Sequence, residues 1–188
     1  MTFPAGSVAL SPELRGDQLR LGLWMFLATV TMLFAAFASA YIVRRSGSDW
    51  RHVQLPAILW VNTGVLGLSS VFVEAGVRAA RRTRWRSASA GFVGALLFGI
   101  AFLAGQALAW RQMVAAGVYL PTNPHSSFFY MLTGAHAVHI VAALVVLAWG
   151  LVSAAGGRLD DVRADLCRTF WHYLGGVWLF LFALVTLL

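Results

Sequence analysis

Four long stretches of this chain contain no charged residue, and a fifth uncharged stretch is longer still. A helix of about 20 residues crosses the ~30 Å hydrocarbon core of a bilayer, so each stretch is long enough to span it. The four are Leu21–Val43, His52–Val73, Ser87–Trp110 and Thr169–Leu188, and the fifth is Gln112–Gly157. The fifth opens with a turn at Pro121 and Pro124, so we expect it to cross once, from about Ser127.

These stretches leave no room for a soluble domain. Only 11% of all residues are charged, against roughly 25% in soluble domains. The sequence therefore predicts an all-α integral membrane protein, a bundle of five transmembrane helices. We expect a cytoplasmic lead-in over residues 1–17 and a single transmembrane domain over 18–188. Its five helices are predicted at about 19–43, 56–80, 87–113, 126–154 and 164–187.

Every basic residue is an arginine, and the fourteen arginines are unevenly placed. The N-terminal segment and the loops 78–86 and 156–168 carry two, five and three of them, whereas the opposite side carries four. Because cytoplasmic loops are enriched in basic residues, this pattern favours a cytoplasmic N-terminus and a C-terminus outside. The net charge of +7 then faces anionic lipid headgroups or acidic partner loops. Without a soluble domain to carry a basic face, we expect no nucleic-acid partner.

Two patterns concern packing and the membrane surface. Gly91, Ala95 and Gly99 recur every four residues, which lets two helix backbones approach closely. Tryptophans lie near the predicted helix ends, as in the aromatic belts of membrane proteins. Trp24 and Trp171 are therefore candidate contacts with lipid or a partner.

Glu74 is the one acidic residue within a predicted span, and it lies one helical turn before Arg78. The simplest interpretation is an ion pair between these two residues on one helix. Alternatively, the pair contacts a lipid amine or a neighbouring subunit. Asp160, Asp161 and Asp165 are expected to be solvated in a loop.

Three histidines lie within the predicted spans. His136 and His139 are one turn apart near the middle of the fourth span, and His172 lies a few residues into the fifth. A ring nitrogen in hydrocarbon needs a partner, because an unpaired buried polar group costs several kcal/mol. The rings could ligate haem, relay protons, or bond to polar groups of neighbouring helices.

The spacing of the histidines bears on these alternatives. His136 and His139 lie three residues apart on one helix and cannot bind opposite faces of one haem, so either would need His172 or another helix to supply the second ligand. The pattern is not repeated elsewhere in the sequence. Cys167 is the only cysteine, which excludes an internal disulfide and a cysteine-based metal site. The residues alone favour a structural role. The His136/His139 turn should pack on another helix, with both rings bonded to hydroxyl or backbone groups.

Motifs in all five predicted spans resemble those of one known family. The first span contains Gly22-Leu23-Trp24-Met25-Phe26-Leu27-Ala28-Thr29, the second Asn62-Thr63 and Ser69-Ser70, and the third Gln106. The fourth contains Ser127-Phe128-Phe129, Thr133-Gly134, His136 and His139, and the fifth Trp171-His172-Tyr173 and Val177-Trp178-Leu179-Phe180. Over nearly its whole length the chain resembles subunit III of haem-copper oxidases, the cytochrome c and quinol oxidases.

The resemblance implies a subunit that binds neither haem nor copper and catalyses no reaction alone. Such a subunit packs against the catalytic subunit I, with subunit II as a further partner, in the inner membrane of a bacterium. It binds phospholipid and supports proton uptake and the durability of the active site, while the complex reduces oxygen to water and translocates protons. The polar residues shared with the family would have structural or interhelical roles: His136, His139, His172, Thr133, Asn62, Thr63, Ser69, Ser70 and Gln106.

The chain also departs from the family pattern. Longer members have seven helices, and this chain resembles the last five. In some five-helix relatives the catalytic subunit carries the missing pair, and the family forms its lipid cleft against that pair. Family carboxylates are replaced by Val30, Ala109 and Gly175, so a role of those carboxylates in proton uptake does not carry over.

Two further hypotheses remain open at the level of the sequence. One is the accessory subunit of a nitric oxide reductase, which resembles subunit III. The other is a small b-type membrane cytochrome that uses His136 or His139 together with His172.

Overall fold

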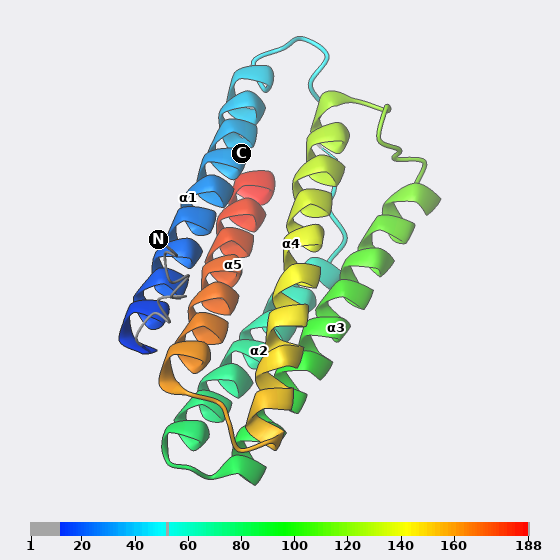
Figure 1. Cartoon of the computed structure of the whole chain (residues 1–188). Coiled ribbons are helices and arrows are strands. Elements are labelled where there is room, and N and C mark those ends of the chain that lie inside the picture. Colours follow the sequence, from blue (N-terminus) through cyan, green and yellow to red (C-terminus); the bar gives the residue numbers. More distant parts are fainter. Residues whose placement is uncertain (1–11, 52, 188) are drawn as a thin grey trace, which may run out of the picture.

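The computed structural model describes residues 12–51 and 53–187, which form five α-helices (Figure 1). The helices are α1 (Pro12–Arg44), α2 (Ile58–Arg81), α3 (Trp85–Ala115), α4 (Pro124–Ala155) and α5 (Asp161–Leu187). All five are long and apolar enough to cross a membrane. Helices suit that environment because each satisfies its own backbone hydrogen bonds, for which lipid offers no partner.

The helix boundaries differ most from the prediction at the N-terminus. Helix α1 begins at Pro12, so residues 12–17 are helical, although they were expected to belong to the lead-in. Residues 1–11 of the expected lead-in lie outside the described part of the chain. The other four helices begin or end within a few residues of the predicted positions.

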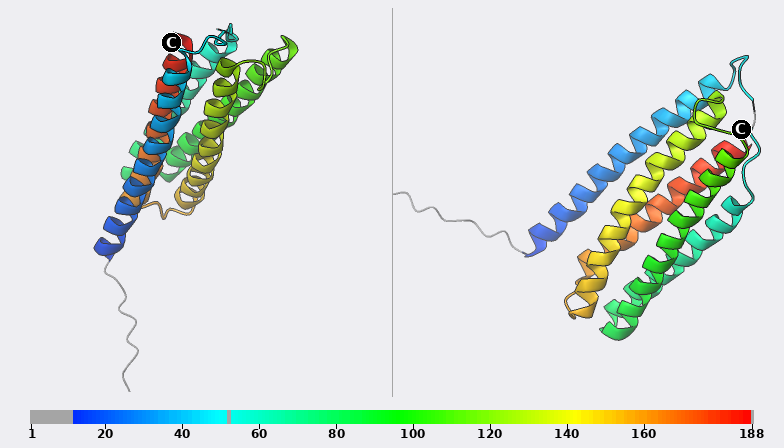
Figure 2. Two further views of the ribbon diagram at one scale, coloured as in Figure 1. Left: turned by 90° about the horizontal axis from the view of Figure 1, so that it is seen from above. Right: turned by 90° about the vertical axis from the view of Figure 1, so that its right-hand side faces the viewer.

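Successive helices run in opposite directions, so their connections gather at two ends of the bundle (Figures 1 and 2). The arginine-rich end contains the start of α1 and the turns at 82–84 and 156–160. The loop end contains the connections 45–57 and 116–123 and the end of α5.

Local sequence explains where α4 begins and where α3 and α4 end. The Asn123 side chain accepts a hydrogen bond from the Ser126 backbone N–H, and the Ser126 hydroxyl accepts one from the Asn123 N–H. This reciprocal cap satisfies two donors at the helix start, and Pro124 fits the first turn because its missing N–H is not needed there. Gly117 and Gly157 follow the helix ends with φ of 77° and 65°, which glycine adopts at little cost.

Helices α2 and α3 form the closest pair of the bundle. A Cβ atom at Gly91 would lie 2.5 Å from the Cα of Gly76, so the two backbones meet with no side chain between them. The Ser69 hydroxyl donates a 2.8 Å hydrogen bond to the Ala95 carbonyl across the same interface. The predicted close approach is therefore confirmed at Gly91. Gly99 instead faces α4 and α5, where a Cβ would lie 2.7 Å from the Trp171 ring.

Helix α1 lies at one edge of the bundle and packs mainly on α5 and α4 (Figure 2). Its buried side chains form one stripe at helical spacing: Leu27, Val30, Phe34, Ala38 and Tyr41. Helix α5 contacts both α1 and α2, and thus lies between them on this side of the molecule.

Candidate functional site

His136 lies at the centre of the bundle with no exposed surface. Its ring centroid is 6.3 Å from that of Phe34 on α1, 6.1 Å from Phe102 on α3 and 5.4 Å from Trp178 on α5. Neither ring nitrogen has a hydrogen-bond partner among the described residues. The expected bond to a hydroxyl or backbone group is therefore wrong for His136. The physical reason is that aromatic rings from three helices occupy the space where a polar partner would lie.

His139, one turn further along α4, has different surroundings. Its Nδ1 lies 2.7 Å from the Ala135 carbonyl of the same helix. The ring packs on Phe26 and Phe34 of α1, with centroid distances of 6.5 and 5.5 Å. The His136/His139 turn therefore packs on another helix as expected, but the one backbone bond lies within α4.

His172 points away from the centre of the bundle. Its side chain is 41% exposed, and its Nε2 lies 3.6 Å from Oε2 of Glu74 on α2. His136 thus lies among aromatic rings and His172 beside a carboxylate, so the pair that one haem would require is not assembled. Among the described residues no group of three or more His, Cys, Asp or Glu side chains is placed to hold a metal ion.

The charged side chains at the arginine-rich end form a network between α2 and α5. Glu74 pairs with Arg78 at 3.2 Å, as the i,i+4 spacing predicts, and Arg168 approaches the same carboxylate at 3.9 Å. Asp165 binds Arg81 at 2.6 Å and Arg168 at 3.2 Å. Asp165 is therefore not a solvated loop residue as expected, because it lies in the first turns of α5 and pairs with Arg81 of α2.

Two tryptophan–threonine hydrogen bonds connect pairs of helices. The Trp110 indole N–H donates to the Thr133 hydroxyl at 3.0 Å, which connects α3 with α4. The Trp178 indole N–H donates to the Thr63 hydroxyl at 3.0 Å, which connects α5 with α2. Each threonine hydroxyl also donates to a carbonyl one turn earlier in its own helix. The sequence indicated both threonines but not their tryptophan donors, which come from distant helices.

The buried amides of the bundle are less completely bonded. The Gln106 side chain makes no hydrogen bond to a described residue through either its amide nitrogen or its amide oxygen. The Nδ2 of Asn62 also has no hydrogen-bond partner among the described residues. The Asn62 amide lies against α3, where a Cβ at Gly105 would come within 2.3 Å of its Oδ1. Both amides lie between helices, as expected for interhelical polar residues. The atoms named above do not make the hydrogen bonds between helices that such a role would suggest.

The two candidate membrane-surface tryptophans differ. Trp24 is 63% exposed and available for contact with lipid or a partner. Trp171 has no exposed surface, so its expected lipid or partner contact is wrong in this structure. Its ring packs against Gly99 of α3, where the absence of a side chain leaves the space that the indole fills.

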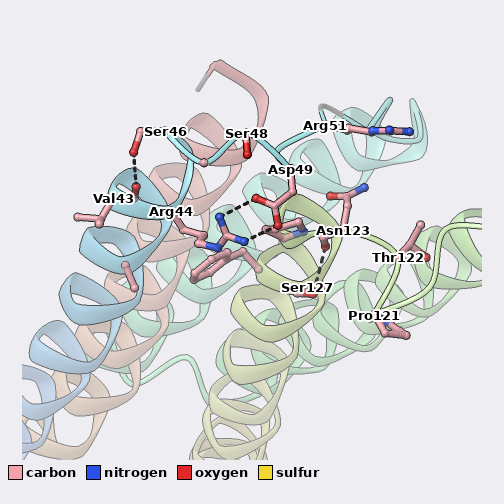
Figure 3. A pocket seen from close by; sticks show the side chains of 14 residues that line it. Val43, Arg44, Ser46, Ser48, Asp49, Arg51, Pro121, Thr122, Asn123 and Ser127 are labelled. Atoms are coloured by element: carbon pink, nitrogen blue, oxygen red, sulfur yellow. Dashed lines mark hydrogen bonds and ion pairs between the residues drawn. The ribbon is translucent and has the colours of Figure 1, made fainter.

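A cavity of about 1230 Å³ at the loop end, with a mixed polar and apolar lining, was not predicted from the sequence (Figure 3). Arg44 donates two hydrogen bonds, of 2.8 and 2.5 Å, to the Asp49 carboxylate at its edge. The bond from Arg44 keeps the pKa of the Asp49 carboxyl below its ordinary value. Gly47 permits this turn, because a Cβ there would overlap the Arg44 guanidinium. The sequence feature that could have indicated this ion pair is Arg44 and Asp49 on either side of Gly47, at the end of the first predicted span.

Comparison with known proteins assigns the chain to a family. Residues 13–187 match the family described as cytochrome c oxidase subunit III. The cytochrome c oxidase subunit 3 of Corynebacterium diphtheriae is 28% identical, over 97% of this chain and 92% of that protein. The probable cytochrome c oxidase subunit 3 of Mycobacterium tuberculosis is 27% identical, over 91% of this chain and 88% of that protein.

A third relative has a different organisation. The haem-copper oxidase subunit I+III of Aeropyrum pernix is 24% identical over 89% of this chain, which corresponds to 22% of that longer protein. Similarity to the two subunit 3 proteins extends over nearly the full length of this chain and of each relative. The family match extends over all five helices. This chain therefore belongs to the cytochrome c oxidase subunit III family, the membrane-embedded subunit III of haem-copper terminal oxidases.

Proposed function

We propose that the chain is a non-catalytic subunit that packs against the haem-copper catalytic subunit I, stabilises it and supports its proton uptake. Subunit II is the further expected partner. The observation that carries this proposal is the family match over residues 13–187, which includes every helix. The subunit I+III relative supports direct contact, because it contains both units in one protein.

Haem and copper are then held by the catalytic subunit. The arrangement of the histidines in this chain supports that division of labour. The His136 ring is surrounded by Phe34, Phe102 and Trp178, which leave no open face for a porphyrin iron. His172 faces Glu74 instead. A structural role for these histidines fits their surroundings better than ligation in a b-type cytochrome.

In the proposed orientation the arginine-rich end faces the cytoplasm of a bacterium, and α5 ends outside. The positive-inside rule supports this orientation, because that end carries ten of the fourteen arginines. The ion-pair network of Glu74 and Asp165 then lies at the side from which the complex takes up protons. Its partly exposed carboxylates and His172 are the groups through which this chain would support proton collection. Val30 and Ala109, where the family has carboxylates, are apolar and buried.

A phospholipid site is proposed between α1 and α4 at the arginine-rich end. A cavity of about 630 Å³ lies there, with an apolar lining that includes Leu23, Phe26 and Val146. The Arg163 guanidinium, 5.2 Å from the centre of the Trp149 ring, lies at the same cavity and offers a cation for a lipid phosphate. The combination of an apolar wall and an interfacial cation suits an acyl chain and its anionic headgroup.

The test is to tag the chain, extract it in mild detergent, and record reduced-minus-oxidised spectra and mass spectra of the proteins that co-purify. The proposal predicts haem and copper in a larger co-purifying subunit and none in this chain alone. Haem that stays with the isolated chain would overturn it in favour of a cytochrome. Consumption of nitric oxide but not oxygen by the co-purified complex would instead indicate the reductase assembly.

A further inference from the structure

The outer face of α5 is hollowed along both of its sides. A cavity of about 490 Å³ lies between α5 and α1, and one of about 280 Å³ lies between α5 and α2. His172 and Gly176 line both cavities, so the two are neighbours across α5. We name this face the α5 trough and define it by Thr31, Ala35, Gly67, Ser70, Gly175 and Gly176.

The helical glycines differ in what a hypothetical Cβ atom would meet. At Gly91, Gly94, Gly99 and Gly105 that atom would lie only 2.3 to 2.6 Å from an atom of a neighbouring helix, so packing within the chain accounts for the absence of a side chain. At Gly176 and Gly67 nothing lies within 4 Å of such an atom, which is also true of Gly22, Gly64 and Gly134 outside the trough. Gly67 and Gly176 in addition line the cavities beside α5.

The trough glycines therefore have no explanation within the chain. Gly175 has only the Ser70 hydroxyl nearby, 3.9 Å from the hypothetical Cβ. Glycine in the middle of a helix lowers helix stability relative to alanine, and an acyl chain adapts to any side-chain surface. A second helix is different, because small residues allow its backbone to approach closely and pack rigidly.

Polar groups of the trough also suit a protein rather than a lipid chain. The Ser70 hydroxyl lines the α2 side of the trough and makes no hydrogen bond to a described residue. Such a hydroxyl can bond to a side chain or backbone group of an adjoining helix in the membrane. At the arginine-rich end of the trough, Glu74 and His172 lie partly exposed beside Arg78, which is 69% exposed. These groups of both signs can pair with the polar end of a helix that lies along the trough.

We infer that the α5 trough is the surface on which a transmembrane helix of the catalytic subunit docks. This inference rests on the proposed function and adds to it the face of contact. The occupant follows from the combination of unexplained glycines, an unbonded hydroxyl and charges at one end, which a helix satisfies together. The subunit I+III relative supports the catalytic subunit as its source, because the two units occur together in that protein.

The first experiment compares two bulky substitutions in tagged chains within the full complex. Gly176→Leu fills the trough, whereas Gly134→Leu adds the same bulk on α4, outside the trough and also into open space. Overpacking of a helix interface should reduce co-purification of the catalytic subunit by about tenfold in Gly176→Leu. Gly134→Leu should retain it, and the membrane level of both variants should equal that of the native chain.

The outcomes separate this inference from the proposed function. Native chain that captures no haem-copper subunit would contradict the proposed function itself. Native chain and Gly176→Leu that capture the catalytic subunit equally would leave the proposed function intact and overturn the trough inference alone. Equal loss in Gly134→Leu would also overturn it, because the effect would then not be confined to the trough.

A second experiment identifies the occupant even if the bulky variant fails to accumulate. Gly176→Cys places an exposed thiol in the trough, while the native Cys167 is buried and provides the unreactive control. A maleimide carrying a photoreactive group is attached to this thiol in the separated chain, and the chain is then added back to the depleted complex. Illumination should capture a transmembrane peptide of the catalytic subunit. Capture of lipid alone, or of a second copy of this chain, would contradict the inference.

Discussion

Two surfaces of this bundle contain glycines, and they differ in what surrounds those glycines. At the α2–α3 interface, Gly76 and Gly91 bring two backbones of the same chain together. Along the α5 trough, Gly67 and Gly176 border open space. The same residue type therefore marks an interface that the chain completes by itself and one that we propose a partner completes. The difference teaches that a small-residue pattern alone does not identify the neighbouring helix.

The largest expected effect concerns the closed interface. Gly91→Leu would place a side chain where even a Cβ atom lies 2.5 Å from the Gly76 backbone. Neither backbone can move aside without separating α2 from α3, so we expect the chain to be absent from membranes or degraded. Immunoblotting of membranes checks this, with Gly134→Leu as the matched control. Normal accumulation of Gly91→Leu would show that the two helices are not in contact as described.

The tryptophan–threonine bonds allow the two faces to be compared with one chemical change. Thr133→Val removes the hydroxyl that accepts from Trp110 in the buried interior, where Thr133 is 2% exposed. The orphaned indole N–H should cost about 1–3 kcal/mol of unfolding free energy. Thr63→Val removes the acceptor of Trp178, which is 1% exposed whereas Trp110 is only partly buried. The N–H orphaned by Thr63→Val is therefore the more deeply buried of the two, and this substitution should cost more. Thermal unfolding of the two purified variants in one detergent measures the difference, and the reverse order would contradict this account.

Removal of the polar atoms of His136 should not lower the stability of the chain, in contrast to removal of the threonine hydroxyls. Its ring is surrounded by aromatic side chains and has no hydrogen-bond partner among the described residues. His136→Phe keeps the ring and removes two unpaired polar atoms, so we expect unchanged or higher stability, by about 1 kcal/mol. His136→Ala leaves a cavity and is expected to lower stability by about 2–5 kcal/mol. If His136→Phe were as damaging as His136→Ala, the ring nitrogens would have partners that this account omits.

The smallest expected effect lies at the loop end. The Arg44 guanidinium lowers the pKa of the Asp49 carboxyl in the folded chain, relative to its ordinary value of 3.8. The pair therefore contributes stability above pH 3.8, and this contribution is lost as the pH falls through the lowered pKa. Asp49→Asn should unfold at a slightly lower temperature than the native chain near pH 7, and the difference should shrink as the pH falls below 3.8. A difference that stays the same throughout the acid range would contradict the pairing.

The sequence predicted the helices well and their neighbours poorly. Length and lack of charge identify a span directly, so all five helices lie close to their expected positions. The start of α1 at Pro12 was missed, because residues 12–17 carry charges that the span criterion excludes. Helices that are apolar on all sides do not reveal which face is buried. Trp171 illustrates this, since its position near a helix end suggested lipid contact although the ring lies inside the bundle.

The polar residues show the same limit. Glu74 and Arg78 pair as expected, because both partners lie one turn apart on one helix. Asp165 was misjudged because its partner Arg81 is distant in the sequence. His136 was expected to find a hydroxyl or backbone group, but three helices surround it with aromatic rings instead. Pairing within a helix is set by its period, whereas pairing between helices depends on packing that one sequence does not specify.

The most direct test of the central claim is the oxygen-consumption time course of the purified oxidase with and without this chain. A non-catalytic stabilising subunit predicts the same haem spectrum and a similar initial rate per haem in both preparations. The preparation without this chain should lose activity within far fewer turnovers, and adding the chain back should restore its lifetime. If the depleted enzyme is inactive from its first turnover and lacks a haem signal, the chain contributes to the redox centre and the account is contradicted.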